Sequence, residues 1–270
     1  MKPIEAYKIE HRGRLRLFLG KRYFSLRRLI KWQSEKHLYA IKKEAPLDQV
    51  IFNHQSVLLR QLRDVDMVWQ RNKITNLKLA SEKISRITIL PGQVFSFWFL
   101  VGKTTKGKGY LKGMNLLNGK VSVDYGGGIC QLGNLIYWMA LHTPLKIRER
   151  WRHSYDVFPD VNRTLPFGSG ATLSYNYIDL QLENTSDQSF QILLWLDNEN
   201  LYGEIRSERE IDVRYEVYES DHIIRHEIWG GYTRHNRISR KVISKANDTI
   251  ISDERVTENH AVMMYEPMLG

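Results

Sequence analysis

The stretch GGGICQLGNLIYWMA, residues 126–140, decides how this chain is expected to fold. Its apolar residues recur at the spacing of one helical face, and Pro144 ends the pattern. The residues on that face are Ile129, Leu132, Leu135, Ile136, Met139 and Ala140. We therefore predict a buried helix that starts beside Ile129, with the chain's single cysteine, Cys130, in its first turn.

Cys130 is a candidate nucleophile because of its place at the start of this helix. Unpaired backbone amides and the positive end of the helix dipole favour a thiolate, which predicts a lowered pKa. The glycines at 126–128 would leave the approach free of side chains and let a substrate carbonyl reach backbone donors. The alternative is that Cys130 is a small packing residue, since free cysteines are commonly buried.

A cysteine nucleophile needs a base, and the base needs an orienting group. We predict His153 as the base, on one of the short strands expected over 145–158, and Asp179 as the orienting carboxylate, on a strand expected over 171–183. Papain-like and transglutaminase-like thiol enzymes use this order of cysteine, histidine and acidic residue.

Other residues compete for these roles. Asp156 and Asp160 are alternatives to Asp179. His142 is a weaker base candidate, because it lies about three helical turns from Cys130 at ~1.5 Å per residue.

Motifs on both sides of the helix carry a family resemblance. They are LPGQVFSF at 90–97, VG at 101–102, GY at 109–110, NGK at 118–120, GGGICQ at 126–131, ER at 149–150, HS at 153–154 and GAT at 170–172, followed by Asp179 and Asn184. Together they resemble the VanW family, which is named for an accessory protein of B-type vancomycin-resistance gene clusters. Family members often have an aspartate before the Ala-Thr pair, where this chain has Ser169-Gly170, so Asp179 stays the preferred orienting residue.

The resemblance implies a role in glycopeptide resistance and cell-wall peptidoglycan metabolism. We expect a cysteine-dependent acyl transferase or amidase acting on peptidoglycan peptides or precursors, with Cys130, His153 and Asp179 as the catalytic residues. The expected substrate-binding residues are Gly126, Gly127, Gly128, Gln131, Tyr110 and Arg150. The alternative is a noncatalytic module that binds such a peptide or precursor in a glycine-lined groove.

The pattern along the 270 residues predicts an α+β fold: N-terminal helices, then a mostly antiparallel sheet domain packed on the helix that carries Cys130, in a papain-like or transglutaminase-like arrangement. We expect a basic, mainly helical region over 1–88, a core over 89–208 and a β extension over 209–270. A helix is predicted from Met67 to Ile84, capped by Asp64 or Asp66.

The formal net charge of +10 comes mostly from the first 50 residues, which hold thirteen Lys and Arg against five Asp and Glu. A basic amphipathic helix is expected between Arg14 and Tyr39, with Leu15, Leu19, Tyr23, Leu26 and Ile30 at helical spacing. Such a helix suits an anionic membrane surface. The alternative is a helix docked on the domain with a solvated basic face.

Several partner classes are not expected. The sequence has no nucleic-acid-binding motif and no cysteine cluster or HExxH for a metal, and we predict no metal and no cofactor. It also lacks a signal peptide pattern and a run of ~20 apolar residues, which predicts a cytoplasmic protein peripheral to the inner membrane face.

Overall fold

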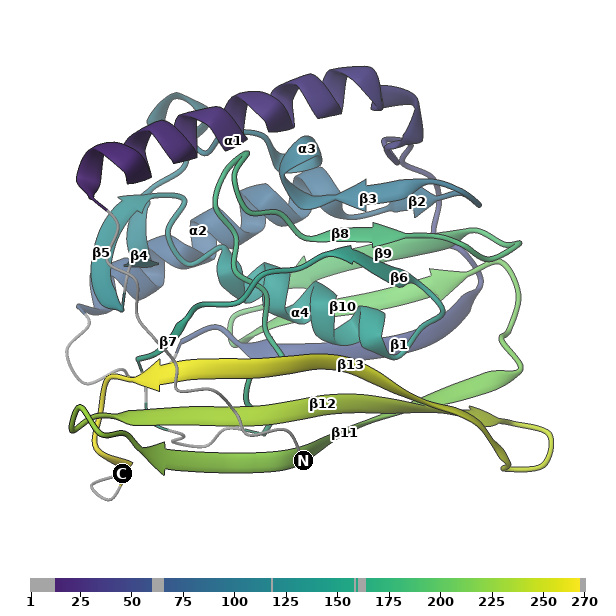
Figure 1. The fold of residues 1–270 in the computed structure, drawn as a ribbon. Helices are drawn as coiled ribbons and strands as arrows, with labels where there is room; N and C mark the ends of the chain where they lie inside the picture. The colour runs from purple at the N-terminus through teal and green to yellow at the C-terminus, as the bar shows by residue number, and fades with distance from the viewer. Residues whose placement is uncertain (1–12, 60–65, 118, 158, 160–163, 268–270) are drawn as a thin grey trace.

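The computed structural model describes residues 13–59, 66–117, 119–157, 159 and 164–267 (Figure 1). Four α-helices are seen in these ranges: α1 (Arg14–Ser34), α2 (Met67–Ile84), α3 (Phe97–Val101) and α4 (Cys130–Leu141), with short 3-10 turns η1 (Lys36–Leu38) and η2 (Lys106–Lys108). The α2 prediction is confirmed at both ends, and the Asp66 side chain caps this helix by accepting a 2.9 Å hydrogen bond from the Val68 amide.

The strands of the described residues form three sheets and a hairpin. The first sheet has the order β1 (Gln49–Val57), β10 (Asn200–Ser207), β9 (Phe190–Leu196), β2 (Ile87–Ile89). The second has the order β11 (Val213–His226), β12 (Tyr232–Ser244), β13 (Ile250–Met263), β7 (Tyr155–Asp156). The third has the order β3 (Val94–Ser96), β8 (Gln181–Glu183), β6 (Lys146–Glu149), and β4 (Lys112–Leu117) pairs with β5 (Lys120–Tyr125). All of the pairings are antiparallel except β13 with β7, so the predicted α+β class is confirmed.

Helix α4 lies at the centre of the molecule, as the apolar pattern predicts (Figure 1). It contacts β1, β10 and α2, and Leu132, Ile136 and Met139 are fully buried. An apolar helix of this kind loses its contact with water on nearly every side, which stabilises the fold by ~1.5–3 kcal/mol for each large side chain.

The expected strands over residues 209–270 are present as β11, β12 and β13. This ribbon runs below the remaining elements in Figure 1, and one hydrophobic core joins it to them, with Trp32, Leu135 and Ile238 as members from the three parts of the chain. The domain boundaries at 88/89 and 208/209 stay predictions.

Short strands are present over 145–158 as predicted (β6 and β7), but the placement of His153 and Asp179 on strands is wrong. His153 lies between β6 and β7 in irregular backbone, and only Gln181–Glu183 of the expected strand over 171–183 is extended in a sheet. The chain instead turns tightly at 174–178, where the Ser174 and Ile178 backbones pair across Asn176, which has a positive φ of 43°. His153 and Asp179 are therefore carried by loops.

Candidate functional site: the start of helix α4 and the cavity beyond its end

The Cys130 thiol, at the first residue of α4, lies against protein atoms. Its Sγ is 3.9 Å from the carbonyl oxygen of Leu173, to which it donates. Burial raises the pKa of the Cys130 thiol, because a thiolate would lose its hydration there. The prediction of a lowered pKa is therefore wrong, because desolvation outweighs the backbone hydrogen bonds that act in the opposite direction.

The glycine run before Cys130 is a crossing point of two backbones. A Cβ at Gly127 would lie 2.1 Å from the carbonyl carbon and oxygen of Gly113, so these two segments touch without side chains between them. The Gly127 carbonyl accepts a 2.9 Å hydrogen bond from the Asn76 amide, which fixes the crossing to α2.

Other atoms also occupy the space beside the neighbouring glycines. Gly126 and Gly128 have positive φ values of 81° and 89°, and Cβ atoms there would lie 2.6 Å from Thr104 and 2.2 Å from Lys73. The expected free approach along glycines 126–128 is therefore corrected: side chains and backbone occupy the space that the missing Cβ atoms leave.

Gln131 is hydrogen-bonded to β1. Its Nε2 donates to the Val57 carbonyl oxygen at 2.8 Å and to the Ser56 hydroxyl. These bonds tie the first turn of α4 to the end of β1.

Asp179 is fully buried, and four donors surround its carboxylate. They are the Ser96 hydroxyl at 2.5 Å, the Trp98 amide at 3.0 Å, the Leu180 amide at 2.9 Å and the Gln181 side-chain amide at 3.1 Å. Burial raises the pKa of Asp179 to about 6, against the opposing effect of these donors. The carboxylate thus anchors the start of α3 on the chain that leads into β8.

His153 is partly buried, and burial lowers the pKa of its imidazole, with the nearby Arg152 acting in the same direction. No hydrogen bond among the described residues joins His153 to Cys130 or to Asp179. Cys130 and Asp179 thus have separate bonding partners: the Leu173 carbonyl for Cys130, and donors from residues 96–98 and 180–181 for Asp179.

The competing residues are placed as follows. Asp156 accepts hydrogen bonds from Arg234 and Tyr265, and Asp160 lies outside the described residues. His142 stacks on Phe52 with 3.9 Å between ring centroids, just beyond the far end of α4.

Arg150 and Tyr110 are buried or nearly so. The Arg150 guanidinium donates to the carbonyls of Gly168 and Gly170, the latter at 2.8 Å, and lies 4.8 Å from the Tyr137 ring centroid. It also reaches Thr257 and Asn259 of β13, so this side chain fastens the 168–170 loop to the second sheet. Tyr110 is 3 % exposed, and its hydroxyl has no hydrogen-bond partner within the described chain.

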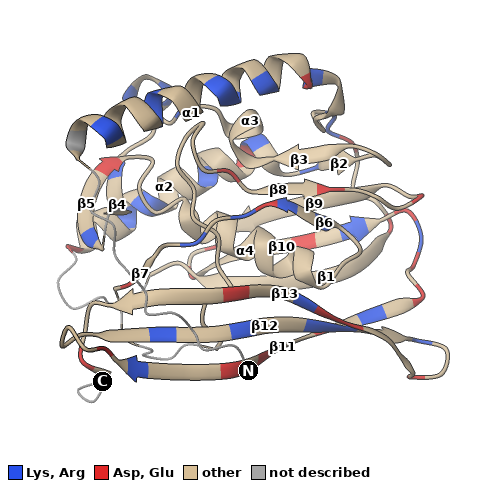
Figure 2. Ribbon diagram, in the orientation of Figure 1, with Lys and Arg blue, Asp and Glu red and all other residues tan. Residues whose placement is uncertain are grey.

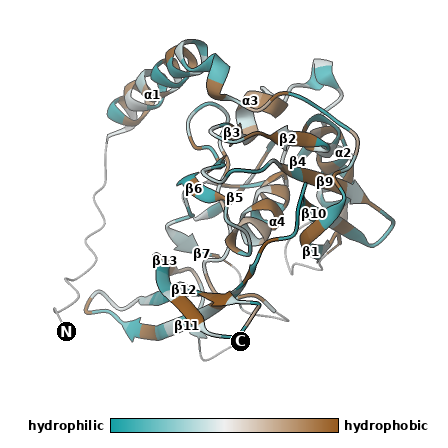
Figure 3. Cartoon of the chain, turned by 90° about the vertical axis from the view of Figure 1, so that its right-hand side faces the viewer, coloured by the Kyte–Doolittle hydropathy of each residue, from teal (hydrophilic) through white to brown (hydrophobic). Residues whose placement is uncertain are grey.

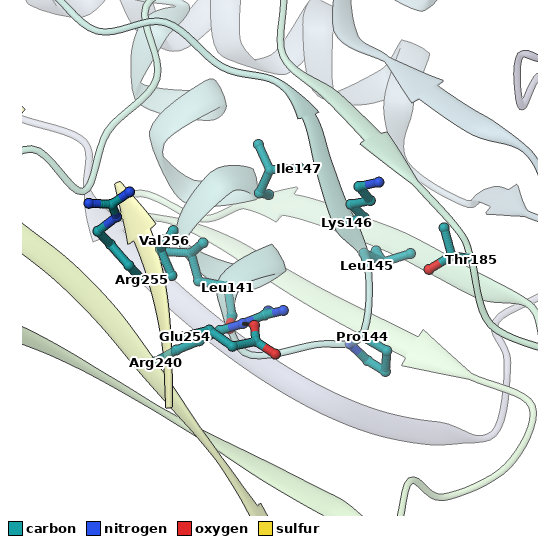
Figure 4. Close-up of a pocket in the computed structure, with 10 residues that line it drawn as sticks. All are labelled: Leu141, Pro144, Leu145, Lys146, Ile147, Thr185, Arg240, Glu254, Arg255 and Val256. Carbon is teal, nitrogen blue, oxygen red and sulfur yellow. Dashed lines mark hydrogen bonds and ion pairs between the residues drawn. The ribbon is translucent and has the colours of Figure 1, made fainter. Parts of the chain in front are cut away.

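A cavity of about 340 Å³ opens beyond the C-terminal end of α4 (Figure 4). Leu141, Leu145 and Val256 give it apolar walls, while Lys146 and Arg255 bring cationic groups to it. Arg240 crosses from β12, donates to the Leu141 and Thr143 carbonyls at 3.3 and 3.1 Å, and pairs with Glu254 at 2.9 Å. Sequence reasoning missed this cavity, because its walls come from segments about 100 residues apart and no local motif marks them.

Within the described ranges, no group of three or more His, Cys, Asp or Glu residues is placed to hold a metal ion. Their helices also include none that combines the length and the apolar character needed to cross a bilayer.

Comparison with known proteins gives a consistent family signal. A family model described as "VanW like protein" matches residues 72–206. The chain is 33% identical over 223 residues to the Vancomycin B-type resistance protein VanW of Enterococcus faecalis strain V583, covering 82% of this chain and 80% of that protein. It is 30% identical over 122 residues to the Uncharacterized protein YoaR of Bacillus subtilis strain 168, covering 45% of this chain and 39% of that protein. No solved structure matches the chain, and the papain-like or transglutaminase-like arrangement stays a prediction.

Proposed function

This chain belongs to the VanW family, and we propose that it contributes to vancomycin resistance by binding a peptidoglycan peptide or precursor without cysteine catalysis. The resistance role is carried over from the name of the relative that aligns with 82% of the chain. The ligand class follows from the cell wall as the place where glycopeptide resistance acts. The cavity beyond α4 is the observation that carries the proposal.

The size and lining of this cavity suit the end of a short peptide. Its volume of about 340 Å³ is near the lower end of the ~300–1,000 Å³ typical of small-molecule sites. Val256 is partly exposed and offers apolar contact for the methyl groups of alanine-type residues, and Lys146 offers an ammonium group to a terminal carboxylate.

The bonding at Cys130 supports binding in preference to catalysis. A cysteine nucleophile works as a thiolate with a base within hydrogen-bond reach. The Cys130 thiol donates to the Leu173 carbonyl and has a raised pKa. The Asp179 carboxylate, which would orient a base, accepts hydrogen bonds from donors on β3, α3 and β8.

Calorimetric titration of the full chain with a synthetic peptidoglycan stem pentapeptide tests the proposal. We expect Val256→Trp to fill the cavity and weaken binding at least about tenfold, which corresponds to ~1.4 kcal/mol. Lys146→Ala is expected to weaken binding about threefold to fivefold, because an exposed ion pair contributes less than ~1 kcal/mol. Val121→Trp and Lys120→Ala, on β5, are the matched controls and should bind as the wild type does.

Cys130→Ser separates the two functions. The proposal expects this variant to bind the pentapeptide within about twofold of the wild type and expects the peptide mass to stay unchanged with either protein. A time-dependent change in peptide mass that the wild type produces and Cys130→Ser does not would restore the cysteine-enzyme reading. Absence of binding by the wild type at millimolar peptide would also overturn the proposal.

A further inference from the structure

Helix α1 packs on the domain along one narrow face of its C-terminal half. Phe24 lies 6.1 Å from Tyr177 between ring centroids, Arg28 forms a two-pronged ion pair with Glu149, and Trp32 lies 5.9 Å from Phe99. These contacts recur every four residues, so one face of the helix is turned toward the protein.

The opposite face of α1 is apolar and exposed. Its residues are Leu15 (71% exposed), Leu19 (56%), Tyr23 (62%), Leu26 (59%) and Ile30 (62%). At about 100° per residue this stripe lies about 180° around the helix from the docked face. Figure 3 shows α1 standing at the edge of the molecule, clear of the sheets. The docked face of α1 therefore combines an ion pair with aromatic contacts, and the outward face is an exposed apolar ridge.

The charge of α1 has one sign. No Asp or Glu occurs from Arg14 to Ser34, and Lys and Arg are spread along the helix (Figure 2). Arg16 and Arg27 follow one edge of the stripe, and Arg22 follows the other. All three are exposed. Their long stems can lie along apolar material while the guanidinium groups reach anionic groups at its surface.

We propose that α1 lies in the plane of an anionic membrane surface, with the stripe of Leu15, Leu19, Tyr23, Leu26 and Ile30 at the acyl boundary and the flanking arginines among the headgroups. The stripe is about 22 Å long at ~1.5 Å per residue, which suits a helix lying along the interface. A convex apolar ridge with cations on both edges can bind a plane of anionic lipids, because a lipid surface needs no groove of matching shape. A protein partner would need a groove of matching length lined with acidic groups.

The full chain should cosediment with vesicles of phosphatidylcholine and phosphatidylglycerol at 7:3, and bind vesicles of pure phosphatidylcholine at least about tenfold more weakly. Leu19→Ser with Leu26→Ser should lower the partition coefficient at least about tenfold, because two large side chains lose their apolar burial. Ile250→Ser with Ile251→Ser is the matched control, since these side chains are 58% and 60% exposed on β13. This control should bind as the wild type does.

The charge is tested separately. Arg16→Gln, Arg22→Gln and Arg27→Gln together should reduce binding and its sensitivity to salt, while Arg71→Gln, Arg209→Gln and Arg214→Gln together, on exposed sites elsewhere, should change it less than about twofold. Point variants are preferred to deleting residues 1–40, because Trp32, Tyr39 and Ala40 are part of the core.

Two results would overturn the proposal. One is equal vesicle binding by the stripe variant and the wild type. The other is a wild-type chain that binds neither kind of vesicle and self-associates through the stripe. Light scattering would then show an oligomer for the wild type and a monomer for Leu19→Ser with Leu26→Ser.

Discussion

The first turn of α4 and the outward face of α1 differ in what the fold leaves unsatisfied. At α4 the chemically conspicuous residues have partners: Cys130 bonds to Leu173, Gln131 to Val57, and Gly127 packs on Gly113. On the outward face of α1 five large apolar side chains are each more than half exposed. A side chain is available to bind a ligand or a surface when no contact within the folded chain already satisfies or buries it.

The largest effect is expected from adding one methyl group at the glycine crossing. Gly127→Ala should destabilise the fold by at least ~3 kcal/mol, because its Cβ would lie 2.1 Å from the Gly113 backbone, which cannot rotate away. Urea unfolding followed by circular dichroism measures this loss. Gly107→Ala is the control, with no atom within 4 Å of its added Cβ, and should change stability by less than ~0.5 kcal/mol. Equal stability of the two variants would mean that the glycine run is an open approach after all.

The next effect concerns the charge of Asp179. Its pKa is raised from 3.8 to about 6 in the folded chain, so the folded state holds this proton more tightly than the unfolded state. The resulting stabilisation is present in full below about pH 4 and is lost as pH rises through about 6, at a cost on the order of 3 kcal/mol. Asp179→Asn should remove this fall in unfolding free energy between pH 4 and pH 7, measured by urea titration at each pH.

Asp187→Asn, at a side chain that is 86% exposed, is the control for that titration and should keep the wild-type pH dependence. An Asp179→Asn variant with the same pH dependence as the wild type would show that Asp179 is not the titrating group.

A smaller effect is expected in the reactivity of Cys130. Alkylation by iodoacetamide at pH 7 should be at least about tenfold slower in the folded chain than in the same chain in urea, since desolvation raises the pKa of the Cys130 thiol. The measurement is unambiguous because the chain has one cysteine. Faster alkylation in the folded state would show that Cys130 is an activated thiol and would support a catalytic site at the start of α4.

The smallest effect is expected on the outward face of α1. Leu19→Ser with Leu26→Ser should change the unfolding free energy by less than ~0.5 kcal/mol, because both side chains are already in water. Trp32→Ala, in the same helix, removes a side chain that is 7% exposed and should cost ~3–5 kcal/mol. A large loss on changing the stripe would show that these leucines serve folding.

Much of the fold could be predicted from local patterns. The bounds of α2 follow from its cap and its periodicity. The apolar spacing from Ile129 and the position of Pro144 predict the central helix. The site could not be predicted in the same way. His153 and Asp179 looked like strand residues, because a few alternating side chains fit a strand as well as a loop. Their loops are set by long-range bonds such as Asp179 to Ser96, which no local pattern contains.

The sequence by itself determined the family, the α+β class, the burial of α4 and the five-residue apolar spacing of α1, because each depends on residue type and on short intervals along the chain. Only the tertiary structure decided which of these features make contacts within the folded chain. It brought Gly113 against Gly127 and Asp179 against α3. It also made a cavity where β12 and β13 cross the end of α4, and turned the apolar stripe of α1 away from the core. The physical reason is that burial and the satisfaction of polar groups are properties of neighbours in space, and those neighbours come from distant parts of the chain.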